Sequence, residues 1–238
     1  LSNVVVSGSA AVGDVTLPAG IPVSGRLLGP SNAPAENVNI NAVDSATRAA
    51  QRLAHDSSAV NGTFRVVVAA GTYDFQYNPP ACSGLAPDEQ RNVTVGGATT
   101  LPTLNMIPGV HALGLVTDAV VVPVVLADLD FFPTATGIKV YAPGDTTDLT
   151  GNYDVVLKPN TYNIDYVPPA GAALRPVHTF SNNVNATATL PTVVLPAGFL
   201  LTGVTRSNAT LLPVAGAEVN LFPPGSPVAA WTPHDHTD

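Results

Sequence analysis

The 238-residue chain contains a single cysteine, Cys82, so no disulfide can form within it. Small secreted scaffolds that lack a large core depend on several disulfides, and that class is excluded. No Lys, Arg or His adjoins Cys82 in the segment 80–87. We interpret Cys82 as an ordinary small side chain, with pairing between two chains as the alternative. The fold must therefore be held by apolar cores.

Charge is also scarce. Charged residues make up 11% of the chain, against about 25% in an average globular protein. Nine Lys and Arg face seventeen Asp and Glu, which gives a formal net charge of −8, and the basic residues are scattered singly. Because no basic patch exists to neutralise phosphates, we expect neither nucleic acid nor an anionic membrane surface as a partner.

Long apolar runs are missing as well. The most apolar stretch, residues 119–127, is interrupted by Pro123. It is far shorter than the ~20 residues that cross a bilayer, so we expect no membrane insertion. Residues 1–10 have no basic segment followed by an unbroken apolar one, and they do not match a signal peptide. We expect an exported form to have lost its signal before this point.

Valine, proline and glycine are abundant. Hydrophobic residues make up 45% of the chain, which has 20 Gly and 23 Pro. Valine favours strands because it branches at Cβ, and Pro and Gly separate short elements. No segment shows a sustained helical period. The composition therefore predicts an all-β fold.

The chain repeats itself with a period of 89 residues. GTYDFQYNPPA at 71–81 recurs as NTYNIDYVPPA at 160–170, and Gly25, Gly114 and Gly203 keep the same spacing. A constant period over many positions is typical of a tandem array. We predict a full unit over 21–109, a second over 110–198, the first half of a third over 199–238, and over 1–20 the terminal strand segment of a preceding or partner unit.

Each unit has the pattern of a small two-sheet sandwich of about seven short strands. Alternation places Val38, Ile40 and Ala42 on one face, and their counterparts 89 residues later are also apolar. The repeated aromatic phrase alternates in the same way, so we predict core strands over 71–78 and 160–167, each ended by two prolines. We expect φ > 0 at Gly71 and Asn160, where a tight turn would precede the strand.

Several motifs recur at fixed places in the units. Gly62–Phe64 recurs as Gly151–Tyr153, and Gly71–Tyr73 recurs as Asn160–Tyr162, which departs only at its first residue. The third unit adds PVAGAEV at 213–219, and the segments from Pro34 and Pro123 lack its Gly-Ala pair. This pattern resembles the carboxypeptidase regulatory-like, or prealbumin-like, family of β-sandwich modules. The resemblance implies tandem Ig-like or prealbumin-like seven-strand sandwiches without catalytic activity, of the kind often repeated in extracellular or cell-surface proteins.

A related class of surface modules forms an isopeptide bond between a Lys on the first strand and an Asn on the last. The only lysines here are Lys139 and Lys158, and neither lies on a first strand. We therefore expect no such bond.

Two groups of polar residues are candidates for metal binding. His234, Asp235 and His236 could offer zinc two imidazoles and a carboxylate. Adjacent residues of an extended chain point to opposite sides, so we favour a solvated loop there. The acidic turns 55–62 and 144–152 could offer oxygens to calcium, but neither carries the D-x-[DN]-x-[DN]-G loop. We interpret both as ordinary turns and expect no bound metal or cofactor.

A catalytic set is not apparent either. His55, His111 and His178 are isolated in the sequence, and no Gly-rich phosphate loop precedes a helix. We expect no enzyme, and a metal-dependent enzyme built on His234 and His236 is the remaining alternative. Four sequons could carry glycans in an exported protein, at Asn61, Asn92, Asn185 and Asn208.

These patterns predict a non-catalytic structural protein of an extracellular fibre, stalk or surface layer, with other copies of the chain as its partners. An incomplete sandwich leaves strand edges unpaired, so residues 1–20 of one copy would add strands to residues 199–238 of another, head to tail. The alternative is a module that binds carbohydrate or protein and is accessory to an enzyme or surface protein. Trp231, the only tryptophan, is its candidate contact.

Overall fold

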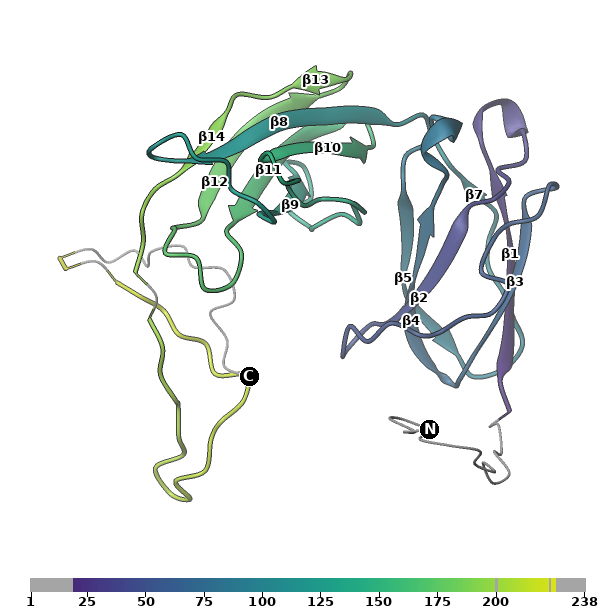
Figure 1. The fold of residues 1–238 in the computed structure, drawn as a ribbon. Coiled ribbons are helices and arrows are strands. Elements are labelled where there is room, and N and C mark those ends of the chain that lie inside the picture. The colour runs from purple at the N-terminus through teal and green to yellow at the C-terminus, as the bar shows by residue number, and fades with distance from the viewer. Residues whose placement is uncertain (1–18, 200, 223, 226–238) are drawn as a thin grey trace, which may run out of the picture.

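The computed structural model describes residues 19–199, 201–222, 224 and 225. It shows two β-sandwich modules side by side, followed by a segment that extends away from the second (Figure 1). The predicted all-β sandwich class is confirmed. Among the described residues, no helix is long and apolar enough to cross a membrane.

The first module has seven strands in two sheets. One sheet has the order β3–β1–β6, and β7 also pairs with β1; the other has the order β2–β4–β5. The elements are β1 (Ile21–Leu28), η1 (Pro30–Asn32), β2 (Asn39–Asp44), β3 (Thr63–Val68), β4 (Gly71–Asn78), η2 (Ala81–Ser83), β5 (Asp88–Val95), β6 (Thr99–Thr100) and β7 (Leu104–Asn105).

The second module has the same topology. Its sheets have the orders β10–β8–β13, with β14 also on β8, and β12–β11–β9. Each strand begins 89 residues after its counterpart, as β8 at residue 110 follows β1 at residue 21. The strands are β8 (Val110–Asp118), β9 (Asp128–Pro133), β10 (Asn152–Leu157), β11 (Asn160–Val167), β12 (Val177–Val184), β13 (Ala188–Thr189) and β14 (Val193–Leu195).

Each module has its own apolar core between its two sheets. The alternating face of β2 is fully buried, and so is the corresponding face of β9. The aromatic phrases are the core strands β4 and β11, as predicted, and Tyr77 and Tyr166 are completely buried. Their hydroxyls are bonded: Tyr77 donates to Gln90 Oε1 at 2.6 Å, and Tyr166 lies 3.2 Å from the Tyr153 hydroxyl.

The prediction of φ > 0 at Gly71 and Asn160 is wrong. Neither residue is among those with positive φ, because each already belongs to an extended strand and pairs with Val95 or Val184. Left-handed glycines instead stand directly before β3 and β10, at Gly62 and Gly151, both with φ of 77°. A Cβ at Gly62 would lie 2.2 Å from the Leu27 carbonyl oxygen, so glycine is required by both conformation and space.

The segment after the second module follows the start of the modules, but its described residues form no buried apolar core. It makes a turn closed by a bridge between Arg206 and Pro213. Apolar side chains at positions that are buried in the modules are exposed here, among them Leu201, Val214, Val219 and Leu221. These described side chains are therefore open to water, unlike their counterparts in the two modules.

Candidate functional site: the junction between the modules

The polar edge strand β5 of the first module lies against the second module. Its burial pattern shows no buried residue before Val95, as is common for an edge strand that avoids indiscriminate pairing. Between the modules is a cleft of about 330 Å³. It is lined by Pro87, Asp88, Glu89 and Arg91 from the first module and by Pro133, Thr136, Ile138, Lys139, Val140, Tyr141, Leu157, Lys158 and Tyr162 from the second.

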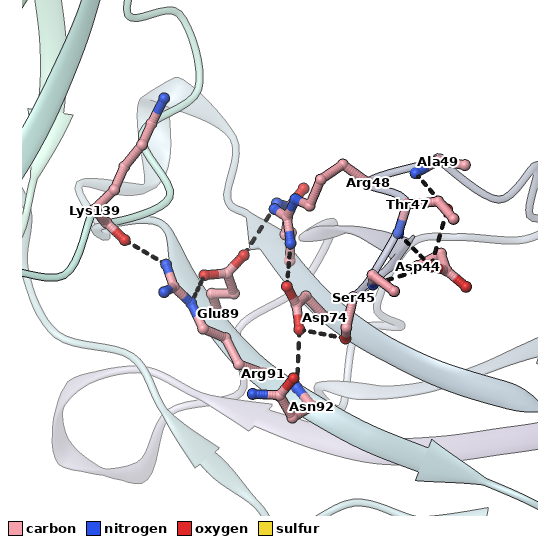
Figure 2. A network of polar contacts seen from close by, with 12 residues as sticks. Asp44, Ser45, Thr47, Arg48, Ala49, Asp74, Glu89, Arg91, Asn92 and Lys139 are labelled. Carbon is pink, nitrogen blue, oxygen red and sulfur yellow. Dashed lines mark hydrogen bonds and ion pairs between the residues drawn. The ribbon is translucent and has the colours of Figure 1, made fainter. Parts of the chain in front are cut away.

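Three polar contacts cross this junction. Lys158 Nζ lies 2.5 Å from Asp88 Oδ1. The guanidinium of Arg91 donates to the Lys139 carbonyl oxygen while it also pairs with Glu89 (Figure 2). The Tyr141 hydroxyl is hydrogen-bonded to Asn41, on β2 of the first module. Both lysines of the chain therefore lie at the junction.

These contacts set the orientation of the modules more than they add stability. An ion pair with a partly exposed lysine contributes only ~0.2–1 kcal/mol, and salt screens it. Burial raises the pKa of Tyr141, the Asn41 hydrogen bond opposes that rise, and the charges of Glu89 and Asp145 add to it. Several weak contacts in one network still restrict rotation of one module on the other.

Beneath β5, a buried carboxylate ties three parts of the first module together. Asp74 on β4 is 4% exposed and accepts from Ser45 Oγ at 2.7 Å and from the Asn92 backbone N–H at 2.8 Å, and it pairs with Arg48 (Figure 2). Burial would raise the pKa of Asp74, but these hydrogen bonds and the Arg48 charge outweigh it and lower the pKa. The network holds β5 at its bulge opposite β4, next to Arg91.

Carboxylates also gather on the second module near the junction. Oxygens of Asp128, Asp130 and Asp145 lie within 4.8 Å of one another, and Lys139 pairs with Asp130. Burial, followed by the Asp128 charge, raises the pKa of Asp145 to about 6. The Lys139 ammonium offsets only part of the negative charge of these three carboxylates.

The acidic turn that follows Asp145 is built from its own hydrogen bonds. Asp148 Oδ1 accepts from the Thr150 backbone and hydroxyl, both at 2.7 Å, and from the Asn152 backbone at 3.0 Å. These bonds lower the pKa of Asp148. In this turn the carboxylate caps backbone groups, as turn-forming Asp residues commonly do.

The face of β12 corresponds to that of β5 but differs in chemistry. In β5, Glu89 accepts from Gln76 at 3.1 Å. The same cross-strand pair in the second module is His178 with Asp165. The ring of Phe180 lies edge-on to His178, with centroids 4.2 Å apart, and 73% of Phe180 is exposed.

The remaining candidates are dispersed. His111 pairs with Asp154 at 2.6 Å across β8 and β10, Cys82 is exposed on η2, and His55 is exposed in a turn. The four sequon asparagines are exposed. Trp231, His234, Asp235 and His236 lie outside the described residues, as does the segment 1–18.

Sequence reasoning missed the junction, although a signal was present. Lys139 and Lys158 stand where the first unit has Ala50 and Ala69. On the other side, Asp88, Glu89 and Arg91 stand where the second unit has Val177, His178 and Phe180. Repeats that share one fold can differ freely only on their surfaces. Charge differences between equivalent positions can fall on any exposed face, and these five coincide with the junction.

Comparison with known proteins gives only distant similarities. No family model and no curated protein matches the chain. Among solved structures, the Bacillus anthracis TIE protein is 14% identical with a TM-score of 0.33. The match covers 75% of this chain and 34% of the TIE protein. A streptococcal ancillary pilin is 14% identical with a TM-score of 0.30, covering 75% and 62%.

The shaft pilin spaA from Lactobacillus rhamnosus GG is 10% identical with a TM-score of 0.30, covering 77% of this chain and 100% of its own. The chain thus spans about a third of the TIE protein and about three fifths of the ancillary pilin. All three TM-scores are low, and the function proposed below rests on this chain's own residues.

Proposed function

We propose that the protein is a non-catalytic structural array of sandwich units, forming part of an extracellular fibre, stalk or surface layer. The units are 21–109 and 110–198, with 199–238 as the first half of a third and 1–20 as the last strands of a preceding or partner unit. The observation that carries this proposal is the junction, where an ion pair, a hydrogen bond from Arg91 and a short anchored linker join two complete modules.

The linker supports a semi-rigid array. The Ala86 N–H donates to the Ile107 carbonyl oxygen and the Gly109 N–H to that of Gly84, both at 2.9 Å. A Cβ at Gly109 would lie 3.1 Å from the Ala86 backbone nitrogen, so the chain passes tightly over the turn. A linker held in this way transmits orientation from one module to the next, unlike a free Gly/Ser tether.

We further propose that copies join head to tail by strand addition. In each module, the short strands β6 and β7, or β13 and β14, pair in parallel with the first strand. Residues 10–16 are the sequence counterparts of β6 and β7, and residues 199–206 are those of β1. Strand addition would cover one edge and part of the exposed apolar surface of the third unit.

Disulfide trapping tests this assembly. Val15 is the counterpart of Leu104, which pairs with Leu27, and Thr205 is the counterpart of Leu27. In a Cys82→Ser background, Val15→Cys with Thr205→Cys should give a ladder of cross-linked chains on a non-reducing gel. Val60→Cys with Thr205→Cys is the control and should give none. A monodisperse monomer by electron microscopy, together with no ladder, would rule out the assembly.

The alternative, a carbohydrate- or protein-binding module, has less support. Such sites usually present exposed aromatic rings. Five of the six tyrosines are buried in the cores, and Tyr141, the sixth, lines the cleft at the junction together with Tyr162. A glycan array or pull-down with the intact chain would favour this alternative if it gave a saturable ligand that a Tyr141→Ala variant no longer binds.

A further inference from the structure

The outer face of the first module's β3–β1–β6 sheet carries two exposed arginines. In the antiparallel register of β1 and β3, Arg26 lies opposite Thr63. Arg65 lies opposite Ser24, two residues further along each strand. Directly opposite residues share one face of a sheet, so the two arginines are diagonal neighbours. The strands β1, β3, β6 and β7 contain no Asp or Glu. Within the described residues no ion pair involves either guanidinium, and this face is therefore basic.

The corresponding face of the second module has the opposite charge. Leu115 stands where the first module has Arg26, and Asp154 stands where it has Arg65. Asp154 lies opposite Leu113 on the outward side of the β10–β8–β13 sheet. The two modules share one topology, and yet this face is basic in the first and acidic in the second. Charge complementarity therefore relates two separate faces of the same chain.

The acidic face is also hollowed, with a volume of about 580 Å³. Its lining combines aliphatic, hydroxyl and carboxylate side chains, contributed by Leu113, Leu115, Thr189, Thr192, Asp148 and Asp154. Asp148 Oδ1 accepts the bonds of its own turn, and Asp154 Oδ1 lies 2.6 Å from His111 Nδ1. A carboxylate can accept at about four sites, so both groups can take a further donor. Arginine matches such a hollow, because its stem packs on aliphatic groups and its guanidinium pairs with carboxylates.

We propose that the basic face of one copy binds the acidic face of another, with Arg26 and Arg65 entering the hollow beside Asp148 and Asp154. The two faces cannot meet within one chain. Figure 1 shows β1 and β3 on the side of the first module away from the second, and β8, β10 and β13 on a different side of the second module. The contact is therefore heterologous, and each chain can bind two neighbours through it. It goes beyond the proposed array, because it joins chains side by side and does not depend on strand addition.

Charge reversal followed by mixing tests the contact in the full chain. By sedimentation velocity at low ionic strength, we expect oligomers that become smaller in about 1 M NaCl, where the Debye length is about 3 Å. Arg65→Asp alone, or Asp154→Arg alone, should weaken this association at least ~10-fold, because each places like charges in the contact. An equimolar mixture of the two variants should restore it, since each variant then offers the face that the other lacks.

Arg52→Asp is the matched control, because it makes the same change of charge at an exposed arginine in the loop between β2 and β3. It should leave the association unchanged. All three sites are exposed, so the thermal midpoints should stay nearly the same. An unaltered chain that does not associate at low ionic strength would overturn the proposal, as would a mixture that fails to restore association.

Electron microscopy of the same samples separates this contact from the end-to-end assembly. Strand addition relies on hydrogen bonds and apolar contact, so filaments should persist in both charge variants and lose only their side-by-side association. Single filaments in every sample, the unaltered chain included, would refute the lateral contact alone. Salt-sensitive lateral pairs without filaments would refute strand addition alone.

Discussion

Lys158 and Asp88 belong to different modules and pair across the junction at 2.5 Å. Lys158 lies in the turn between β10 and β11, and Asp88 is the first residue of β5. Neither residue contributes to the core of its own module. Their pairing is therefore a property of the array, and it can be changed without unfolding either unit.

Reversal of one charge should loosen the junction, and reversal of both should restore it. We expect Lys158→Glu to increase the radius of gyration in small-angle scattering and to lower stability by no more than ~1 kcal/mol, because the pair is partly exposed. Lys158→Glu with Asp88→Lys should return the scattering curve to that of the unaltered chain. High salt should reproduce the single variant. Equal curves for all proteins would show that the pair does not set the orientation.

Gly62 and Gly151 should be the least replaceable glycines of the two modules. Alanine there would force a side chain into φ of 77° and place Cβ 2.2 or 2.6 Å from a backbone oxygen. We expect a loss of at least ~1–3 kcal/mol in urea unfolding followed by circular dichroism. Gly84→Ala is the matched control, since Gly84 has φ of 67° with no atom within 4 Å. It should lose only about 1 kcal/mol.

The two tyrosines in the core of the second module should behave as a coupled pair. Their hydroxyls lie 3.2 Å apart, and Phe64 occupies the position of Tyr153 in the first module. We expect Tyr166→Phe to cost about 1 kcal/mol, because it leaves the Tyr153 hydroxyl buried without that partner. The double change to phenylalanine should cost less than the sum of the single changes. Strict additivity in thermal unfolding would contradict the coupling.

Asp145 should make the protein less stable as the pH rises from about 4 to about 7. Burial and the neighbouring Asp128 raise its pKa in the folded state to about 6 from a usual 3.8. The folded state therefore binds this proton more tightly than the unfolded state, and the stabilisation is present below the lower pKa and lost as the pH passes the higher. Because Asp145 is partly exposed, we expect less than ~3 kcal/mol in all.

The control for this titration is Asp145→Asn, which should flatten the dependence over this range. Asp74 supplies the opposite trend, since its pKa is lowered in the folded state. Stability that depends on the Asp74 carboxylate is present above its usual pKa of 3.8 and is lost as the pH falls below it. A decline toward neutral pH that persists in Asp145→Asn would assign the effect to another group.

The strands and cores could be predicted because they depend on local alternation. Tyr73, Phe75 and Tyr77 point to one side of any extended strand, and a face so apolar has to be buried. The turn before that strand was predicted incorrectly, because Gly71 and Asn160 already pair within the sheet and neither has a positive φ. The residue types Gly and Asn allow such a turn conformation but do not require it.

The junction could not be derived from alternation. Asp88 and Lys158 are far apart in the chain, and their pairing depends on how two finished modules are oriented by the linker at Gly109. Comparison of equivalent positions in the two units, such as Arg91 and Phe180, distinguishes residues that the fold requires from residues that form the contact between the modules. Internal repeats supply that comparison within one sequence.

The parallel pairing of the first and last strands of each module determines how it carries load. Leu27 and Leu28 on β1 pair with Leu104 and Asn105 on β7, and the chain enters by the start of β1 and leaves by the end of β7. Tension applied between the two ends of a module would pull these two strands past each other, so their hydrogen bonds would be strained together in shear and would not open one at a time. Single-molecule stretching should therefore show each module yielding abruptly at high force, and a gradual extension would contradict this geometry.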